Sequence, residues 1–208
     1  MARDTRQRIL DGSLAMFNAQ GEPNVTTNHI ADELEISPGN LYYHFRNKDD
    51  IIEQLFGRYE SRMDAALTAP SGRLPELEDV WLQLHLVFEC IWDYRFLYRD
   101  LVDILSRNRR LRIRFARILR RADEQARLVM RGLTQAGVMR ASPAEVEAAS
   151  TNLLVIATFW LNYAAVRGDQ DEQAAIRQGI VQVLMSLAPF LRDAERLHLD
   201  TLIGAYRD

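Results

Sequence analysis

Residues 37–48 form the segment that most constrains this chain, because they predict a very short helix with two chemically different faces. Ser37 is a favourable N-cap and Pro38 suits the first helical position. Leu41 and Phe45 are four residues apart and share an inward face. The other face carries hydrogen-bonding side chains: Asn40, Tyr42, Tyr43 and His44. A helix of two turns is not stable alone, so neighbours must hold it and present it to a partner.

The preceding residues predict one such neighbour. Thr26 or Thr27 can cap a helix whose apolar positions are Ile30, Ala31 and Leu34. A connection of about three residues then leads to Ser37. Helix, tight turn and helix is the helix-turn-helix pattern, in which the second helix enters the major groove of DNA. Asn and Ser side chains can bond to base edges, whereas Tyr, Thr, His and Lys commonly hold phosphates.

The run from Val25 to Ile52, with its Tyr-x-His-Phe-x-x-Lys segment, resembles the N-terminal DNA-binding domain of TetR-family repressors. The resemblance covers about residues 3–60. It implies an all-α protein with an N-terminal three-helix helix-turn-helix domain and a larger C-terminal helical domain for ligand binding and dimerisation. It also implies a transcriptional repressor whose operator binding is released by a small molecule.

By position in the family motif, four side chains would hold phosphates: Thr27, Tyr43, His44 and Lys48. The residues that would face bases or the adjacent backbone are Ser37, Pro38, Gly39, Asn40 and Tyr42, and Thr26 completes the expected DNA-binding set. One position departs from the family. Glu35 stands where a glycine is usual between the two helices. If this residue is left-handed, glutamate costs on the order of 1 kcal/mol; the alternative is a turn of a different shape, which would change the angle of the recognition helix.

Charge gives weaker support for DNA binding than the motif does. Residues 1–50 contain five basic and eight acidic groups, a net charge of −3. A non-specific DNA-binding segment is usually basic. We therefore expect recognition through a few well-placed contacts and only modest non-specific affinity.

The whole chain is consistent with a cytoplasmic regulator. It has 208 residues, 48% of them hydrophobic, enough for a sizeable core. Cys90 is the single cysteine, so an intrachain disulfide is impossible and a reducing compartment fits. The start of the chain does not resemble a signal peptide. The most apolar run, residues 153–166, is too short to cross a bilayer, so no membrane association is expected.

Helical periodicity continues through the remainder, and no segment alternates as a strand would. We place the DNA-binding domain at residues 1–48, a connecting fourth helix at about 48–67, and the ligand-binding and dimerisation domain at 68–208. Residues 69–75 break the pattern. The later helices are expected at about 76–94, 96–106, 110–135, 143–166, 172–187 and 189–204.

Large aromatic side chains gather in the second half. They can line an apolar ligand pocket, or they can equally fill a core. Because the resemblance implies an effector, the candidate pocket residues are Trp81, His85, Phe88, Trp92, Phe115, Phe159, Trp160 and Tyr163.

Arginines dominate residues 107–131, with ten of them against two acids. Three interpretations compete. The arginines can pair with carboxylates of another helix, for which Asp93, Asp100 and Asp103 share a face. They can also bind an anionic ligand, or contact DNA phosphate or another polyanion.

Helices 143–166 and 172–187 are the expected homodimer interface, although they could instead form a hairpin packed within one chain. A dimer also suits the DNA, because two recognition helices related by a two-fold axis match a palindromic operator in double-stranded DNA.

No enzyme motif is present, so no catalytic residue and no cofactor are expected. His85, Glu89 and Cys90 make at most a weak metal constellation, and no metal site is predicted. A third class of protein, a helical scaffold that binds partner proteins, would not explain the helix-turn-helix pattern of residues 26–48.

Overall fold

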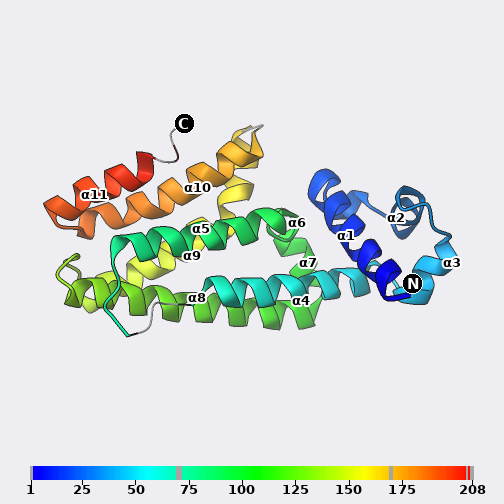
Figure 1. Ribbon diagram of the computed structural model, residues 1–208, viewed down its shortest axis with the longest axis horizontal. Helices are drawn as coiled ribbons and strands as arrows, with labels where there is room; N and C mark the ends of the chain where they lie inside the picture. Colours follow the sequence, from blue (N-terminus) through cyan, green and yellow to red (C-terminus); the bar gives the residue numbers. More distant parts are fainter. Residues whose placement is uncertain (1, 69–71, 169–170, 205, 207–208) are drawn as a thin grey trace. The chain divides into compact units, whose positions relative to one another are not determined.

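The computed structural model describes residues 2–68, 72–168, 171–204 and 206, and these residues are helical throughout, apart from turns and one isolated bridge between Met139 and Leu191 (Figure 1). The elements in the first half are α1 (Ala2–Gln20), η1 (Glu22–Asn24), α2 (Thr27–Glu33), α3 (Pro38–His44), α4 (Lys48–Ala66) and α5 (Leu77–Asp93). Those that follow are α6 (Arg95–Arg99), α7 (Leu101–Arg107), α8 (Arg109–Gln135), α9 (Pro143–Arg167), α10 (Glu172–Leu187), η2 (Ala188–Phe190) and α11 (Asp193–Gly204).

The chain forms two compact units. Unit 1 contains residues 1–62 and 93–114, and unit 2 contains residues 63–92 and 115–208. The long helices α4 and α8 each contribute residues to both units. The expected division of DNA binding and ligand binding between residues 1–48 and 68–208 concerns function, so it stays a prediction.

Unit 1 is built around side chains that the helical periodicity directs inward. Phe17 of α1 packs on Phe96 of α6, with ring centroids 5.3 Å apart. Beside them the amide of Asn18 donates to the carbonyl of Asp93 at 2.8 Å, and the Asn18 oxygen accepts from the backbone amide of Phe96 at 3.1 Å. The hydroxyls of Tyr59 and Tyr98 are also buried in unit 1, and they share a hydrogen bond of 2.7 Å. These bonds satisfy polar groups that burial would otherwise penalise.

The predicted helix at 96–106 is divided in the structure. α6 ends at Arg99 and α7 begins at Leu101, with Asp100 as the residue between them. The predicted helix at 189–204 also differs, since η2 covers Ala188–Phe190 and α11 begins only at Asp193. Pro189 lies in η2, where its missing amide proton costs no intrahelical bond. Residues 69–71 of the predicted break lie outside the described residues.

In unit 2, α9 and α10 pack along one another (Figure 1). α9 starts with a capping box in which the Ser142 hydroxyl accepts from the Glu145 amide and the Glu145 carboxylate accepts from the Ser142 amide. Gly179 of α10 permits the close approach. A Cβ there would lie 2.6 Å from Phe88 and 2.7 Å from Trp160, so the two aromatic rings fill the space beside the bare backbone.

α9 is also the one helix among the described residues that is long and apolar enough to cross a membrane by length and composition. Only 28% of its most apolar 18-residue window is buried inside the protein. Such a helix is weak evidence for membrane insertion, and its uncovered surface requires another explanation.

Candidate functional site

The helix-turn-helix consists of two helices with side-chain caps. The hydroxyl of Thr26 accepts from the His29 amide at 3.2 Å and starts α2. The hydroxyl of Ser37 accepts from the Asn40 amide at 3.1 Å and starts α3. Leu41 is fully buried, which fixes the inward face of α3. Thr26 and Ser37 were both predicted as DNA contacts. They also have a structural role, because their caps fix where the two helices begin.

The turn between these helices contains a left-handed residue. Glu35 has φ of 53°, and it is the only residue other than glycine with positive φ in the part of the chain that the structure describes. The Ile36 amide donates to the Ala31 carbonyl at 3.0 Å, which closes the end of α2. Of the two possibilities left open by the sequence, the structure has the left-handed turn, without the usual glycine. A side chain here carries a steric cost.

The outer face of α3 is open to solvent. Tyr43 is 80% exposed and Tyr42 is 49% exposed. The hydroxyls of Tyr42 and Thr27 lie 3.0 Å apart and share a hydrogen bond, so two predicted DNA contacts from different helices form one unit. His44 is half-buried and meets the Tyr43 ring edge-on, with centroids 5.0 Å apart. The remaining predicted residues of this face are also exposed: Ser37, Pro38, Gly39 and Asn40.

Lys48 does not lie free on this face. Its ammonium donates to the carbonyls of Glu22 and Val25, each at 3.0 Å, and lies 2.8 Å from a carboxylate oxygen of Glu22. The Glu22 side chain is fully buried. This geometry argues against the predicted phosphate contact of Lys48, because the ammonium already donates to two carbonyls and pairs with a buried carboxylate.

The eight aromatic and histidine residues predicted to line one pocket are not brought together. Phe88 and Phe115 are buried in the core, and Trp81 stacks on His85. Two others lie at the surface: Phe159 is 45% exposed and Tyr163 is 53% exposed. Aromatic residues at helical spacing indicate a face but not what covers that face, which is why the predicted grouping fails.

Two of the predicted pocket residues do line a cavity of about 330 Å³ in unit 2. His85 and Trp92 of α5 form one wall with Glu89. The other lining residues are Gln173, Ile176, Arg177 and Ile180 of α10, and Tyr206. The Tyr206 hydroxyl lies 3.4 Å from Nδ1 of His85, and burial raises the pKa of this hydroxyl above its ordinary value. The cavity thus combines an apolar wall with several polar groups.

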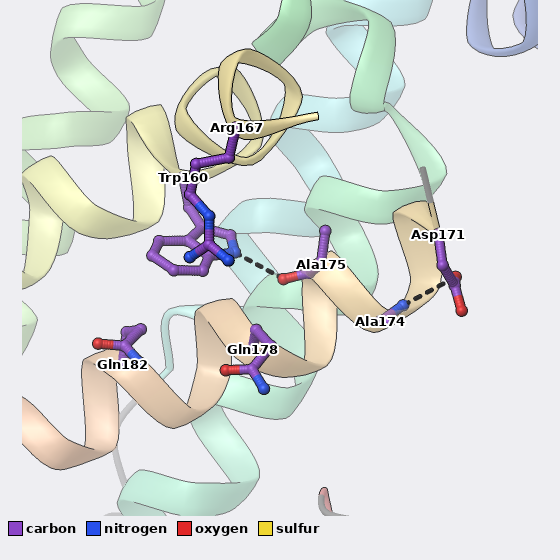
Figure 2. A pocket seen from close by; sticks show the side chains of 7 residues that line it. All are labelled: Trp160, Arg167, Asp171, Ala174, Ala175, Gln178 and Gln182. Carbon is purple, nitrogen blue, oxygen red and sulfur yellow. Dashed lines mark hydrogen bonds between the residues drawn. The ribbon is translucent and has the colours of Figure 1, made fainter. Parts of the chain in front are cut away.

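Figure 2 shows a second cavity, of about 390 Å³, between α9 and α10. Trp160 contributes its indole, whose Nε1 donates to the Ala175 carbonyl at 2.6 Å. Asp171 caps α10 at one end of the cavity by accepting from the Ala174 amide at 3.0 Å. A third, smaller cavity of about 240 Å³ has Pro75 and Gln135 in its lining. The predicted pocket residues therefore divide between separate cavities, the core and the surface.

Three arginines of α8 pair with acids of α4, not with the aspartates that we expected, and Arg127 pairs with Asp123 and Glu147. Within unit 1, Arg114 holds Glu60 at 2.6 Å and Arg110 lies 3.3 Å from Glu53. Within unit 2, Arg121 holds Asp64 at 2.6 Å. Pairing between helices is the correct interpretation for these three arginines, but the predicted partners are wrong. Asp93 binds Arg62, and Asp103 binds Arg107.

Two residues of these sites had no sequence signal. Glu22 precedes a proline in a loop, and nothing in its neighbourhood predicts that it is buried. Tyr206 lies near the C-terminus, outside every motif. For metals, the described residues contain no cluster of three or more His, Cys, Asp or Glu side chains that could hold an ion.

The two capped helices form a helix-turn-helix, and the outer face of α3 is exposed, with Tyr42 bonded to Thr27. These features are typical of a DNA-binding protein. Sequence comparison agrees. The profile described as "Bacterial regulatory proteins, tetR family" matches residues 9–55, and the one described as "Bacterial transcriptional repressor" matches residues 58–199. The chain belongs to the TetR family of bacterial transcriptional regulators. The predicted family and fold class are confirmed, and membership of this family makes the protein a regulator, not an enzyme.

The similar proteins include regulators of known structure. A TetR-family transcriptional regulator from Marinobacter aquaeolei VT8 is 39% identical, covers 98% of this chain and 99% of its own, and superposes with a TM-score of 0.89. The SmeT–triclosan complex is 22% identical over 92% of this chain and 94% of its own, with a TM-score of 0.61, which shows a shared fold. The uncharacterised regulator TtgW of Pseudomonas putida is 32% identical over 71 residues, 34% of this chain. That match spans 53% of the length of TtgW.

We predict that Glu35→Gly stabilises the protein by about 1 kcal/mol, because glycine adopts the left-handed conformation without steric cost. Glu33→Gly is the matched control. It changes the exposed last residue of α2, which is not left-handed, so glycine there should leave the free energy of unfolding unchanged or lower it by up to about 1 kcal/mol. Urea unfolding of both variants and the parent measures the two changes. A loss of stability in Glu35→Gly would contradict the strain that we assign to this turn.

Proposed function

We propose that this protein is a homodimeric transcriptional repressor that binds a palindromic operator and is released from it by a small molecule. The observation that carries the proposal is the exposed face of α3, on which Tyr43 is 80% exposed and Tyr42 is bonded to Thr27. A regulator of this kind acts in the cytoplasm, where the DNA is.

The proposed DNA contacts divide by chemistry. Ser37, Asn40 and Tyr42 lie on the exposed face of α3 and would meet base edges or the adjacent backbone. Gly39, with no side chain, would let the backbone approach closely, and Pro38 would pack beside it. Thr27, Tyr43 and His44 would hold phosphates. Lys48 is left out of this surface because its ammonium is already bound within the protein.

We expect selection from a random duplex pool to enrich one palindrome with two half-sites. Tyr43→Ala should then weaken operator binding by about tenfold or more, because a hydrogen bond to a charged group is worth about 1.5–3 kcal/mol. Its melting temperature should be unchanged, since the side chain is largely exposed. Leu197→Ala, on a similarly exposed residue of α11, is the control and should leave binding unchanged. Failure of the folded parent to enrich any sequence would contradict the proposal.

The dimer is supported by an apolar stripe along α9. Val155, Phe159, Tyr163 and Val166 recur at spacings of three or four residues, and each is at least 45% exposed. On α10, Met185 is also exposed. A continuous apolar stripe of this kind marks an interaction surface. A second copy presenting the same two helices would cover it, and would also account for the uncovered surface of α9.

Phe159→Asp should therefore convert the dimer to a monomer at micromolar concentration, because it places a charge in an apolar interface. Sedimentation velocity measures the change in mass, and operator affinity should fall with it. Leu197→Asp is the matched control on α11 and should remain dimeric. A Phe159→Asp protein that sediments as the parent does would exclude this face as the interface.

We place the effector in the 330 Å³ cavity of unit 2. Its volume lies at the small end of the range for ligand pockets, and apolar walls with a few polar groups are typical of such sites. Ile176, Ile180 and Trp92 would contact the body of the ligand, while Glu89 and Arg177 would meet its polar groups. The similar SmeT structure is a complex with triclosan, so a protein of this fold can hold a small molecule. Reciprocal coupling then requires that operator DNA weakens effector binding.

We predict that Gln173→Trp, which fills this cavity from its exposed rim, abolishes release by any compound that frees the parent protein from its operator. Operator affinity without compound should be unchanged. Gln135→Trp fills the separate 240 Å³ cavity and should keep the response. The measurement is operator dissociation, followed by fluorescence anisotropy, against a collection of small apolar compounds. A full response in Gln173→Trp would place the effector elsewhere.

A further inference from the structure

Lys48 is the only lysine in this chain, beside 25 arginines. Its surroundings suit an ammonium group and not a guanidinium. Three oxygens lie within 3.0 Å of Nζ: the carbonyls of Glu22 and Val25, and one carboxylate oxygen of Glu22. An ammonium is a compact charge whose N–H donors diverge from one point, so it can donate to both carbonyls and still lie against the carboxylate, whereas the donors of arginine lie in a rigid plane. The site therefore accounts for the use of lysine here.

Glu22, whose carboxylate Lys48 contacts, is fully buried. Its negative charge therefore needs cations beside it, because an unpaired charge is costly inside a protein. Lys48 holds one oxygen of Glu22. The other oxygen is held by Arg107, the last residue of α7. The backbone amide of Glu22 donates to the Asp100 carboxylate at 3.1 Å. η1, which leads into α2, is thus tied to the start of α4 and to both ends of α7.

Two further acids, Asp100 and Asp103, lie near Glu22 and its two cations. Burial raises the pKa of the Asp100 carboxyl, and the negative charge of Glu22 adds to that shift. Asp103 lies 3.4 Å from Arg107 and shares it with Glu22. Arg107 is consequently the cation on which the acids from η1 and α7 converge. Its removal would leave Glu22 with Lys48 alone.

We propose that Lys48 and Arg107 are positioning residues that act through Glu22, and that the charge of Lys48 is not used to bind DNA phosphate. The Lys48–Glu22–Arg107 bridge orients η1 and the start of α2, and through them the recognition helix α3. Operator affinity then depends on Arg107, a residue of α7 that lies outside the helix-turn-helix. This goes beyond the proposed function and revises the role that the family motif suggests for Lys48.

Lys48→Arg separates the two roles, because it keeps the charge and changes the donor geometry. A phosphate-binding residue tolerates this change, since arginine binds phosphate well. A positioning residue does not. We expect Lys48→Arg to weaken operator binding at least about fivefold, and Lys48→Met to weaken it by a similar factor. Parental affinity in Lys48→Arg would overturn the proposal.

The salt dependence gives a second readout. Each phosphate contact contributes about 0.9 to the slope of log affinity against log salt, so losing one in each subunit would lower the slope by roughly 1.8. We expect the Lys48→Met slope to equal that of the parent. A slope lower by about that amount would show that Lys48 binds phosphate. The parent protein must bind its operator in the same assay, so failure of the proposed function would appear separately, as absence of binding.

Arg107→Met tests the distant end of the bridge. It should weaken operator binding with an unchanged salt slope, whereas Arg112→Met should not weaken it. Arg112 is the matched control because it is exposed and has no ion pair among the described residues. Equal affinities for the two variants would overturn the role of Arg107. Circular dichroism at the assay temperature establishes that each variant is folded.

If a variant does not fold, amine acylation of the parent protein still decides the role of Lys48. An N-hydroxysuccinimide ester can modify the N-terminal amine and one side chain, Lys48, so mass spectrometry follows a single lysine. We expect slow modification of Lys48 in the free protein and no further protection when operator DNA is added. Fast modification that DNA suppresses would show a free, phosphate-binding lysine.

Discussion

The carboxylate of Glu22, which is fully buried, lies where η1 contacts α4 and α7. Because an ionised carboxyl is costly inside a protein, η1 can adopt its position only where cations reach Glu22. Lys48 contacts one oxygen of this carboxylate and Arg107 the other. The arrangement of unit 1 thus depends on electrostatic compensation as well as on the packing of side chains such as Phe17 and Phe96.

The parts of the structure that sequence alone predicted are those governed by short-range chemistry. Ser37 was expected to cap α3 and Leu41 to face inward, and both do so. Asn47 caps α4 in the same local way, since its side chain accepts from the Asp50 amide at 2.8 Å. Helix caps and the inward faces of helices are determined by interactions between residues no more than about four apart in the sequence. The conformation of Glu35 was left open by the sequence, because a glutamate at a position that usually carries glycine fits either a strained left-handed turn or a turn of another shape; the structure has the left-handed one.

The parts that failed depend on which helix covers which face. The spacing of the α8 arginines gave the face correctly, but Glu60 and Glu53 of α4 lie opposite Arg114 and Arg110 where aspartates of other helices were expected. The same limit applies to Phe88, whose ring fills space beside Gly179 instead of lining a cavity. Helical periodicity defines a direction from the helix axis, and it does not identify the neighbour in that direction.

The hydrogen bond between Thr27 and Tyr42 joins α2 to α3 before any DNA is present. A tyrosine that is already restrained loses less rotational freedom on binding than a free one, so less of the contact energy is spent on ordering it. Among closely related complexes, differences in affinity are expressed mainly in dissociation rates. The restraint on Tyr42 should therefore affect how long the protein stays on a site more than how quickly it arrives.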